Sequence, residues 1–206
     1  MVGISYEKLD FVKDLYHKKK LSMREIAEQL DVSIDAVVYF MRKNEILRRS
    51  LKESNALVFQ NKELSFSEKT GLSSTEKELK IAGLMLYWGE GYKSPKSAGV
   101  DFANSDPEMI SVFTEFLRKI YRVDERRFRA LLYCYSDQDV KELIRFWSRL
   151  TKISEKQFTK PYVRNDFRKD GRKMQYGMVH IRYADKKLFL SIMRSIEELK
   201  SKMRRW

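Results

Sequence analysis

The stretch IAGLMLYWGEG, residues 81–91, contains the longest uncharged apolar run of the chain and ends in a glutamate between two glycines. The pattern Thr75-x-x-Glu78 before it is typical of a capping box, so we expect a helix over 75–90. Because apolar residues occupy every side of the helix along this run, the sequence predicts that it is buried on all sides. Glu90 is unusual at the end of such a helix, since a helix C-terminus favours cations by about 0.3–1 kcal/mol.

A carboxylate in that position needs a basic partner or a metal ion to offset its desolvation. Lys93, three residues further on, is a candidate structural partner. Alternatively, a carboxylate that holds Mg²⁺ or another divalent cation presents positive charge to a phosphate. Gly83 is a second anomaly, because glycine inside a helix costs about 1 kcal/mol relative to alanine. It favours close approach of another backbone at this point.

The charge balance indicates a polyanionic partner. The 206 residues include 42 Lys and Arg against 29 Asp and Glu, which gives a formal net charge of +13. This favours nucleic acid over an acidic membrane surface. The single cysteine, Cys134, excludes a disulfide framework and favours a reducing compartment. No apolar run approaches the roughly 20 residues of a membrane helix. We therefore expect a cytoplasmic protein, nucleoid-associated if the source is prokaryotic, with no membrane partner.

The segment MREIAEQLDVSIDAVVYFM, residues 23–41, has two apolar helical faces separated by a break at Asp31-Val32. Ser33 is a candidate N-cap of the second helix. This segment resembles a helix-turn-helix of the repressor type. Asp31 stands where that turn usually has glycine, and aspartate tolerates a left-handed backbone better than most residues. A hairpin that only packs on the rest of the chain is the structural alternative.

In a helix-turn-helix the second helix enters the major groove through its N-terminal half. The DNA-binding candidates on that helix are Ser33, Asp35, Tyr39, Arg42 and Lys43, with Ile34 and Val38 also exposed. Candidates for phosphate contacts are Lys18, Lys19, Lys20, Arg24, Arg48 and Arg49. We expect this domain to span residues 1–50. A polar, Gly- and Ser-containing linker should follow over 51–74, with one possible helical turn at 56–59.

The remainder of the chain repeats a β run followed by an amphipathic helix. The three β runs are VDFANSD (100–106), LLYCYSD (131–137) and VHIRYAD (179–185). Their terminal acids, Asp106, Asp137 and Asp185, read as helix N-caps, not as metal ligands. The hexapeptides VDERRF (123–128) and ISEKQF (153–158) extend the repeat between the first two units. Such a repeat predicts a sheet covered on one face by helices.

Strand alternation nominates the side chains of the uncovered face. Arg127 and Arg129 share one face of their strand, as do His180 and Arg182 of the last strand. Lys160 and Tyr162 share a face of the strand between them. Asp170-Gly171 is a hairpin turn signal. It predicts a basic β-ribbon arm suited to a DNA groove, formed by Arg164, Arg168, Lys169, Arg172 and Lys173. A solvated loop is the structural alternative.

The segment GLMLYWGEG, residues 83–91, resembles the LAGLIDADG motif of homing endonucleases. In that family two such helices pack side by side, each supplies one acid to a shared divalent-metal site over DNA, and single-motif proteins act as homodimers. The resemblance implies that Glu90, with Gly89 at the helix end, holds Mg²⁺ or another divalent cation. It also implies a dimer interface on the face that carries Leu79, Gly83 and Leu86.

Together these features predict an α+β protein. An all-α helix-turn-helix domain (1–50) and a linker (51–74) should precede a LAGLIDADG-like domain (75–206), with a curved antiparallel or mixed sheet covered on one face by helices. The functional hypothesis is sequence-specific binding of double-stranded DNA and its metal-dependent cleavage by a homodimer formed through the 75–90 helix. Lys93, Lys160 or Arg182 would assist as transition-state cations. The alternatives are a DNA-binding transcription regulator of the same fold that does not cleave, and an RNA-binding protein.

Overall fold

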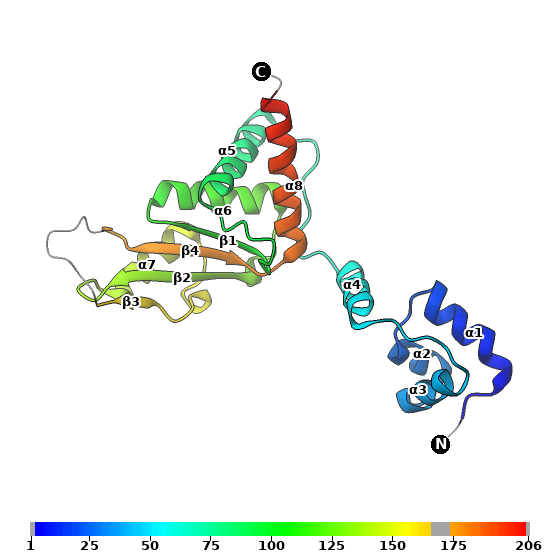
Figure 1. Cartoon of the computed structure of the whole chain (residues 1–206). Coiled ribbons are helices and arrows are strands. Elements are labelled where there is room, and N and C mark those ends of the chain that lie inside the picture. The colour runs from blue at the N-terminus through cyan, green and yellow to red at the C-terminus, as the bar shows by residue number, and fades with distance from the viewer. Residues whose placement is uncertain (1–2, 166–173, 205–206) are drawn as a thin grey trace. The chain divides into compact units, whose positions relative to one another are not determined.

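The computed structural model describes residues 3–165 and 174–204, and the chain divides into two compact units, Met1–Glu63 and Leu64–Trp206. Helices form the first unit, and the second contains a four-stranded mixed sheet interleaved with helices (Figure 1). The predicted α+β class is therefore confirmed. In the described part of the chain, no helix is both long and apolar enough to cross a membrane.

The first unit begins with the short elements η1 (Tyr6–Lys8), α1 (Leu9–Lys13) and η2 (Asp14–Lys18). Helices α2 (Met23–Leu30), α3 (Ile34–Lys43) and α4 (Leu51–Asn61) follow. A capping box between Ser22 and Glu25 starts α2, and Asp31 ends it in the left-handed conformation, at φ 52°. The predicted turn is therefore present, and the Ser33 hydroxyl accepts a hydrogen bond from the Ala36 amide at 3.1 Å to start α3. The core of the unit consists of Val12, Leu15, Tyr16, Ile26, Ala27, Val37, Phe40, Met41 and Ile46.

The segment expected to be a linker has more structure than the sequence indicates. Helix α4 fills residues 51–61, where a capping box joins Ser50 and Glu53. From residue 64 on, the chain is part of the second unit, because the amides of Ser67 and Lys69 donate to carbonyls of α6 at 2.9 and 2.8 Å. The polar composition hides these backbone interactions, which depend on distant residues.

The sheet of the second unit has the strand order β1-β4-β2-β3. Its strands are β1 (Val100–Asn104), β2 (Phe128–Tyr135), β3 (Tyr162–Arg164) and β4 (Met178–Tyr183). Strand β4 lies between β1 and β2 and is antiparallel to both, whereas β2 and β3 are parallel. The sheet is therefore mixed. The prediction had left an antiparallel and a mixed sheet open.

Helices follow three of the strands as predicted: α6 (Pro107–Tyr121) follows β1, α7 (Val140–Thr151) follows β2, and α8 (Lys186–Met203) follows β4. Asp106 and Asp185 cap their helices. Asp139 caps α7 in place of the expected Asp137, because a turn lies between the end of β2 and the start of α7. The two matching hexapeptides form equivalent short helices, η3 (Glu125–Arg127) and η4 (Glu155–Gln157).

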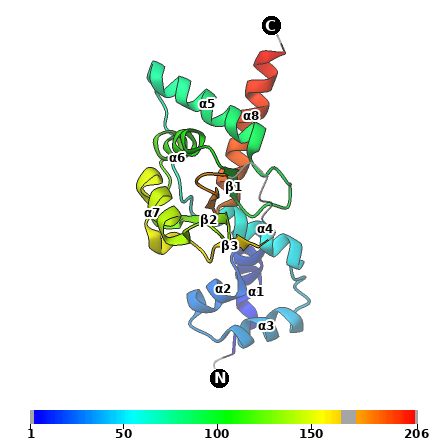
Figure 2. The ribbon, with the colours of Figure 1, turned by 90° about the vertical axis from the view of Figure 1, so that its left-hand side faces the viewer.

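The two faces of the sheet differ in burial. Along β2 the buried residues alternate with exposed or half-buried ones, as expected for a sheet with one covered face. The buried face packs with helices α5 (Ser74–Glu90) to α8 in one core, whose largest buried side chains include Trp147, Tyr87 and Phe116. Figures 1 and 2 show α5, α6 and α8 together on one side of the sheet. We call the other side, with Arg129, Leu131 and Tyr133 of β2, the uncovered face.

Helix α5 differs from its prediction in two respects. Its capping box joins Ser73 and Glu76, two residues earlier than the expected pair of Thr75 and Glu78. It is also not buried on all sides, because Ile81, Met85 and Trp88 are exposed. The helix lies on top of α6 and beside α8, and among the described residues these two helices cover one side of it.

Gly83 does make a close contact within the chain, but with a side chain and not with another backbone as predicted. A Cβ atom at this position would lie 2.1 Å from Cγ of Phe116 in α6. Gly83 is therefore buried and not open to a partner subunit, and Leu79 and Leu86 are partly buried against the same core. The face predicted as the dimer interface is instead the face that joins α5 to its own domain.

Two glycines of α5 give a matched test of this packing. Gly83→Ala should lower the free energy of unfolding by about 1–3 kcal/mol, because the methyl group overlaps the Phe116 ring and outweighs the gain in helix propensity. Gly89→Ala should raise it by up to about 1 kcal/mol, because nothing lies within 4 Å of the position that its methyl group would take. All three tryptophans follow residue 64, so their fluorescence in urea reports on this unit. Equal effects of both substitutions would contradict the assigned contact.

Candidate nucleic-acid interface

The exposed side of α3 carries all five residues nominated on this helix. Asp35, Tyr39, Arg42 and Lys43 are exposed, and so is the capping residue Ser33. Tyr39 is 56% exposed although it is a large aromatic residue. The guanidinium carbon of Arg42 lies 5.7 Å from the centre of its ring. Burial of Val37, Phe40 and Met41 on the opposite side holds the helix on the core. The arrangement places a cation and an aromatic ring together on an accessible helix surface.

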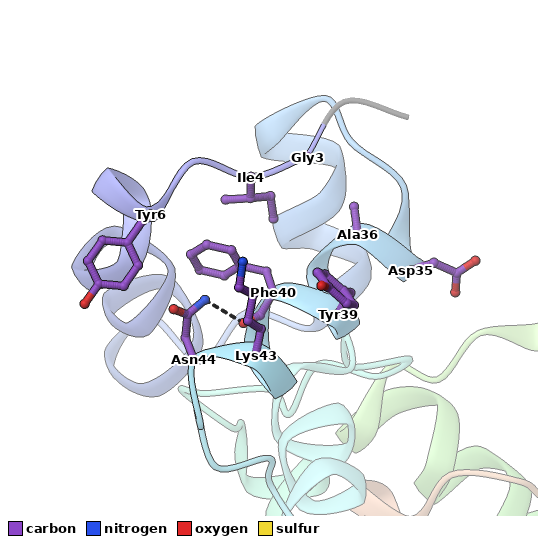
Figure 3. A pocket seen from close by; sticks show the side chains of 9 residues that line it. All are labelled: Gly3, Ile4, Tyr6, Asp35, Ala36, Tyr39, Phe40, Lys43 and Asn44. Atoms are coloured by element: carbon purple, nitrogen blue, oxygen red, sulfur yellow. Dashed lines mark hydrogen bonds between the residues drawn. The ribbon is translucent and has the colours of Figure 1, made fainter.

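A pocket of about 510 Å³ runs along the side of α3 that faces the N-terminal segment (Figure 3). Its lining includes Asp35, Tyr39 and Lys43 of the exposed helix side, together with Ile4 and Tyr6. Figure 3 shows the side chains of Ile4, Tyr6, Tyr39 and Lys43 around an open space, whereas that of Asp35 points away from it. The side chains on this flank of α3 therefore have room to adjust their rotamers when a ligand approaches the helix.

Two of the basic residues proposed for phosphate contact have partners within the first unit. The guanidinium group of Arg49 donates to the backbone carbonyls of Lys20 and Leu21 and lies 4.1 Å from the centre of the Tyr16 ring. Lys18 pairs with Asp14 at 3.1 Å. Arg49 thus joins the segment after α3 to the turn before α2, and its charge is already engaged.

The uncovered face of the sheet has its polar side chains in rows. In one row Asp101 of β1, Arg182 of β4 and Arg129 of β2 are direct neighbours in the strand register. In the next row His180 lies between Ala103 and Leu131. The two arginines and the histidine therefore come from adjacent strands, as the alternation predicted for Arg129, His180 and Arg182.

Asp101 organises this region, and sequence reasoning did not nominate it. One carboxylate oxygen accepts a hydrogen bond from Nδ1 of His180, and the other accepts one from Nε of Arg182, both at 2.9 Å. Burial alone would raise the pKa of Asp101, but the hydrogen bond from His180 and the charges of His180 and Arg182 lower the pKa overall. The carboxylate is therefore ionised at neutral pH, and Nδ1 of His180 carries a proton.

Aromatic rings extend the row toward the other sheet edge. The Tyr133 ring stacks on His180, with 4.8 Å between ring centres, and contacts Tyr162 of β3 at 5.0 Å. Tyr162 is 55% exposed. These rings form an amphipathic surface beside the cationic side chains, which suits contact with sugars, bases or phosphates.

Other nominated residues lie elsewhere. Arg127 belongs to η3 and not to a strand; it donates to the Ala184 carbonyl and lies over the Tyr183 ring, away from the row of Arg129. Lys160 is exposed just before β3, and Arg164 ends that strand next to Tyr135 in the register. The remaining residues of the proposed arm, Arg168, Lys169, Arg172 and Lys173, lie outside the described residues, as does its turn at Asp170-Gly171.

Glu90 is the last residue of α5 and is exposed. Among the described residues it has no hydrogen-bonding or ion-pair partner, so the proposed pair with Lys93 does not form. The Lys93 ammonium instead donates to the carbonyls of Gly91, at 2.7 Å, and Gly89, at 3.5 Å. It thereby compensates the partial negative charge of the helix end. Gly91, directly after Glu90, forms an isolated β-bridge with Phe102. This bridge fixes the end of α5 at the β1 edge of the sheet.

The surroundings of Glu90 give little support to a metal site formed by one chain. In the described ranges, no group of three or more His, Cys, Asp or Glu side chains is placed to hold a metal ion. The Lys93 ammonium already contacts the carbonyl of Gly89, the residue that was named with Glu90 at the expected metal site. No protein-family model, curated protein or solved structure matches the chain.

The pKa of Asp101 leads to a prediction of acid sensitivity. Because the pKa is lower in the folded state than in the unfolded chain, the ionised carboxylate stabilises the fold above the unfolded value of about 4. This contribution is lost as the pH falls through the lower folded value. In urea titrations at pH 7 and pH 3, Asp101→Asn should therefore show a smaller loss of stability on acidification than the unmodified chain. An equal loss in both proteins would contradict the assigned interactions.

Proposed function

We propose that the chain binds double-stranded DNA in a sequence-specific manner. The observation that carries the proposal is the uncovered sheet face, on which Arg129, Arg182 and His180 lie in adjacent rows beside the rings of Tyr133 and Tyr162. Cationic side chains on adjacent strands suit the closely spaced phosphates of a duplex. The net charge of +13 acts in the same direction.

Sequence specificity is assigned to α3. Its exposed side offers hydrogen-bonding and aromatic groups, which can contact base edges when the helix lies in a major groove. The left-handed turn at Asp31 and the Ser33 cap expose the N-terminal half of this helix, as such docking requires. A protein that binds DNA through both surfaces, without cleaving it, fits a transcription regulator.

Tyr39 provides the test of base recognition. A preferred site is first selected from random duplexes with the full chain, and its affinity is then measured by fluorescence anisotropy against a scrambled duplex. Tyr39→Ala should weaken binding of the selected site about tenfold and bind the scrambled duplex nearly as before, because the lost contact reads bases. Phe11→Ala removes another exposed aromatic ring of the same unit and is the control. Equal losses on both duplexes would argue against recognition by α3.

Metal-dependent DNA cleavage by a homodimer is the second candidate. The observation that favours it is Glu90, whose exposed carboxylate has no partner among the described residues, at a helix end where it gains nothing structurally. Glu90 from each of two subunits would hold Mg²⁺ or another divalent cation, which supplies charge neutralisation and an activated water at the phosphodiester. Because Lys93 donates to backbone carbonyls at the helix end, Lys160 and Arg182 are the better candidates for cations that stabilise the transition state.

Glu90→Gln separates the two candidates. If the protein cleaves, this variant should lose cleavage of the selected duplex in Mg²⁺ and bind it equally well or slightly tighter in Ca²⁺. Glu78→Gln makes the same change at an exposed position of the same helix and should cleave normally. Cleavage by Glu90→Gln would exclude this metal assignment. Failure of the unmodified chain to cut any duplex would leave the non-cleaving regulator.

The dimer would form through the exposed side of α5, not through the predicted side. Ile81, Met85 and Trp88 follow the i, i+4, i+7 spacing of one helical stripe, and all three are exposed apolar residues. A second copy of the same stripe would cover them with twofold symmetry, as an isologous interface requires. With the twofold axis running along the helices, such an interface would bring the two C-terminal ends of α5, each with Glu90, toward a common site.

Two equally exposed methionines test this arrangement. Met85→Glu places a charge in the proposed interface and should convert a dimer to a monomer in sedimentation velocity, because a buried unpaired carboxylate is unfavourable. Met109, in the first turn of α6, is 39% exposed, as is Met85. Met109→Glu should leave the dimer intact. A dimer that survives Met85→Glu, or an unmodified chain that is monomeric, would reject this interface.

A further inference from the structure

The position of Asp101 conflicts with the function proposed for the surface around it. A carboxylate on a face that contacts DNA repels phosphates, and it reduces the local positive charge. Asp101 nevertheless lies in the same cross-sheet row as Arg182 and Arg129. Its value to the protein must therefore come from its two hydrogen bonds, which hold side chains from the neighbouring strand.

Those two bonds leave specific atoms unused. Arg182 engages Asp101 through Nε, and no hydrogen bond of its two terminal nitrogens is found among the described residues. The guanidinium group is rigid and planar, so fixing Nε also fixes the direction of the terminal nitrogens. His180 donates through Nδ1, so Nε2 of the neutral ring is an acceptor, and the free donors beside Asp101 are those of Arg182. The side chain of Arg182 is 39% exposed, so its free end can be reached by a ligand.

The neighbouring arginine indicates the charge of that ligand. Arg129 is the direct register partner of Arg182 on the other side, and like charges on opposed positions of adjacent strands are unfavourable. Asp101 contacts only Arg182 of the two. Arg129 donates through one terminal nitrogen to the carbonyls of Arg126 and Phe128. Two guanidinium groups with one carboxylate leave an excess positive charge that one anion would balance.

We infer that Asp101 is a positioning residue for DNA binding. It directs the terminal nitrogens of Arg182 at one backbone phosphodiester, which Arg129 contacts from the adjacent strand, and its other oxygen holds the His180 ring beside them. This rests on the proposed function, and it adds the chemical group that the sheet face recognises. Bidentate contact of a guanidinium group with phosphate needs a fixed orientation, and the carboxylate supplies it at the cost of one negative charge.

Whether Asp101→Ala weakens or tightens DNA binding distinguishes a positioning role of Asp101 from a purely electrostatic one. If Asp101 were only a negative charge, Asp101→Ala would tighten binding to the selected duplex. If it positions Arg182 and His180, Asp101→Ala should weaken binding about tenfold, the order expected for losing a charge-assisted contact. Salt titration by anisotropy adds a second readout, because losing one phosphate contact should reduce the log–log salt slope by about 0.9.

A double-variant cycle with the full chain completes the test. Arg182→Ala should weaken binding to a similar extent and also reduce the salt slope. Because Asp101 acts largely through Arg182, adding Asp101→Ala to Arg182→Ala should change affinity by less than about threefold. Arg194→Ala removes an equally charged, exposed residue from α8 on the helix side of the sheet and should leave affinity nearly unchanged.

Each outcome decides the inference. Tighter or unchanged binding by Asp101→Ala overturns it while DNA binding by the unmodified chain stands. Absence of duplex binding by the unmodified chain rejects the proposed function itself, and the inference with it. If Asp101→Ala is unfolded, Asp101→Asn replaces it in the same titration and must also weaken binding, because an amide has one acceptor oxygen for two donors. Tighter binding by Asp101→Asn overturns the inference.

Discussion

The contact between Gly83 of α5 and Phe116 of α6 determines how the second unit is arranged. Without a Cβ at residue 83, the Phe116 ring lies directly on the helix backbone, and α5 is held against the core on that side. The bridge from Gly91 to Phe102 then fixes the end of the helix at the β1 edge. The consequence is that the opposite stripe of α5 and the carboxylate of Glu90 are both exposed, which is the basis for proposing a dimer and a metal site there.

The same one-sided packing leaves the other face of the sheet for function. Helices α5 to α8 and the buried residues of the strands form one core, so the alternate strand residues point away from it. These residues combine arginines and a histidine with tyrosine rings, and they include a single organised carboxylate in the described rows. A surface that served only solubility would not require Asp101 to hold Arg182 and His180 in fixed directions. Under the proposed function, this uncovered face is the one that lies on DNA.

Local signals in the sequence predicted several turns and caps, although they missed α4, whereas the long-range contacts could not be predicted. The turn at Asp31, the caps at Ser33, Asp106 and Asp185 and the end of α5 at Glu90 depend on neighbours within four residues, and all were predicted. The partner of Gly83 could not be predicted, because the residue that fills the space is 33 positions away on another helix. Asp101 was missed because its importance depends on the register between β1 and β4, which the pattern of one strand does not contain. Arg127 was misplaced because a short helical turn precedes β2 and interrupts the alternation.

Photocrosslinking from the sheet tests DNA contact by the uncovered face most directly. Leu131, between the rows of Arg129 and Tyr133 on that face, would be replaced by p-benzoylphenylalanine in the full chain, which is then bound to its selected duplex and irradiated. Leu190, an exposed residue of α8 on the helix side, carries the same group in the control protein. The proposed function predicts covalent DNA adducts from position 131 and none above background from position 190. Adducts from 190 alone, or none from 131 in a duplex-bound protein, would contradict it.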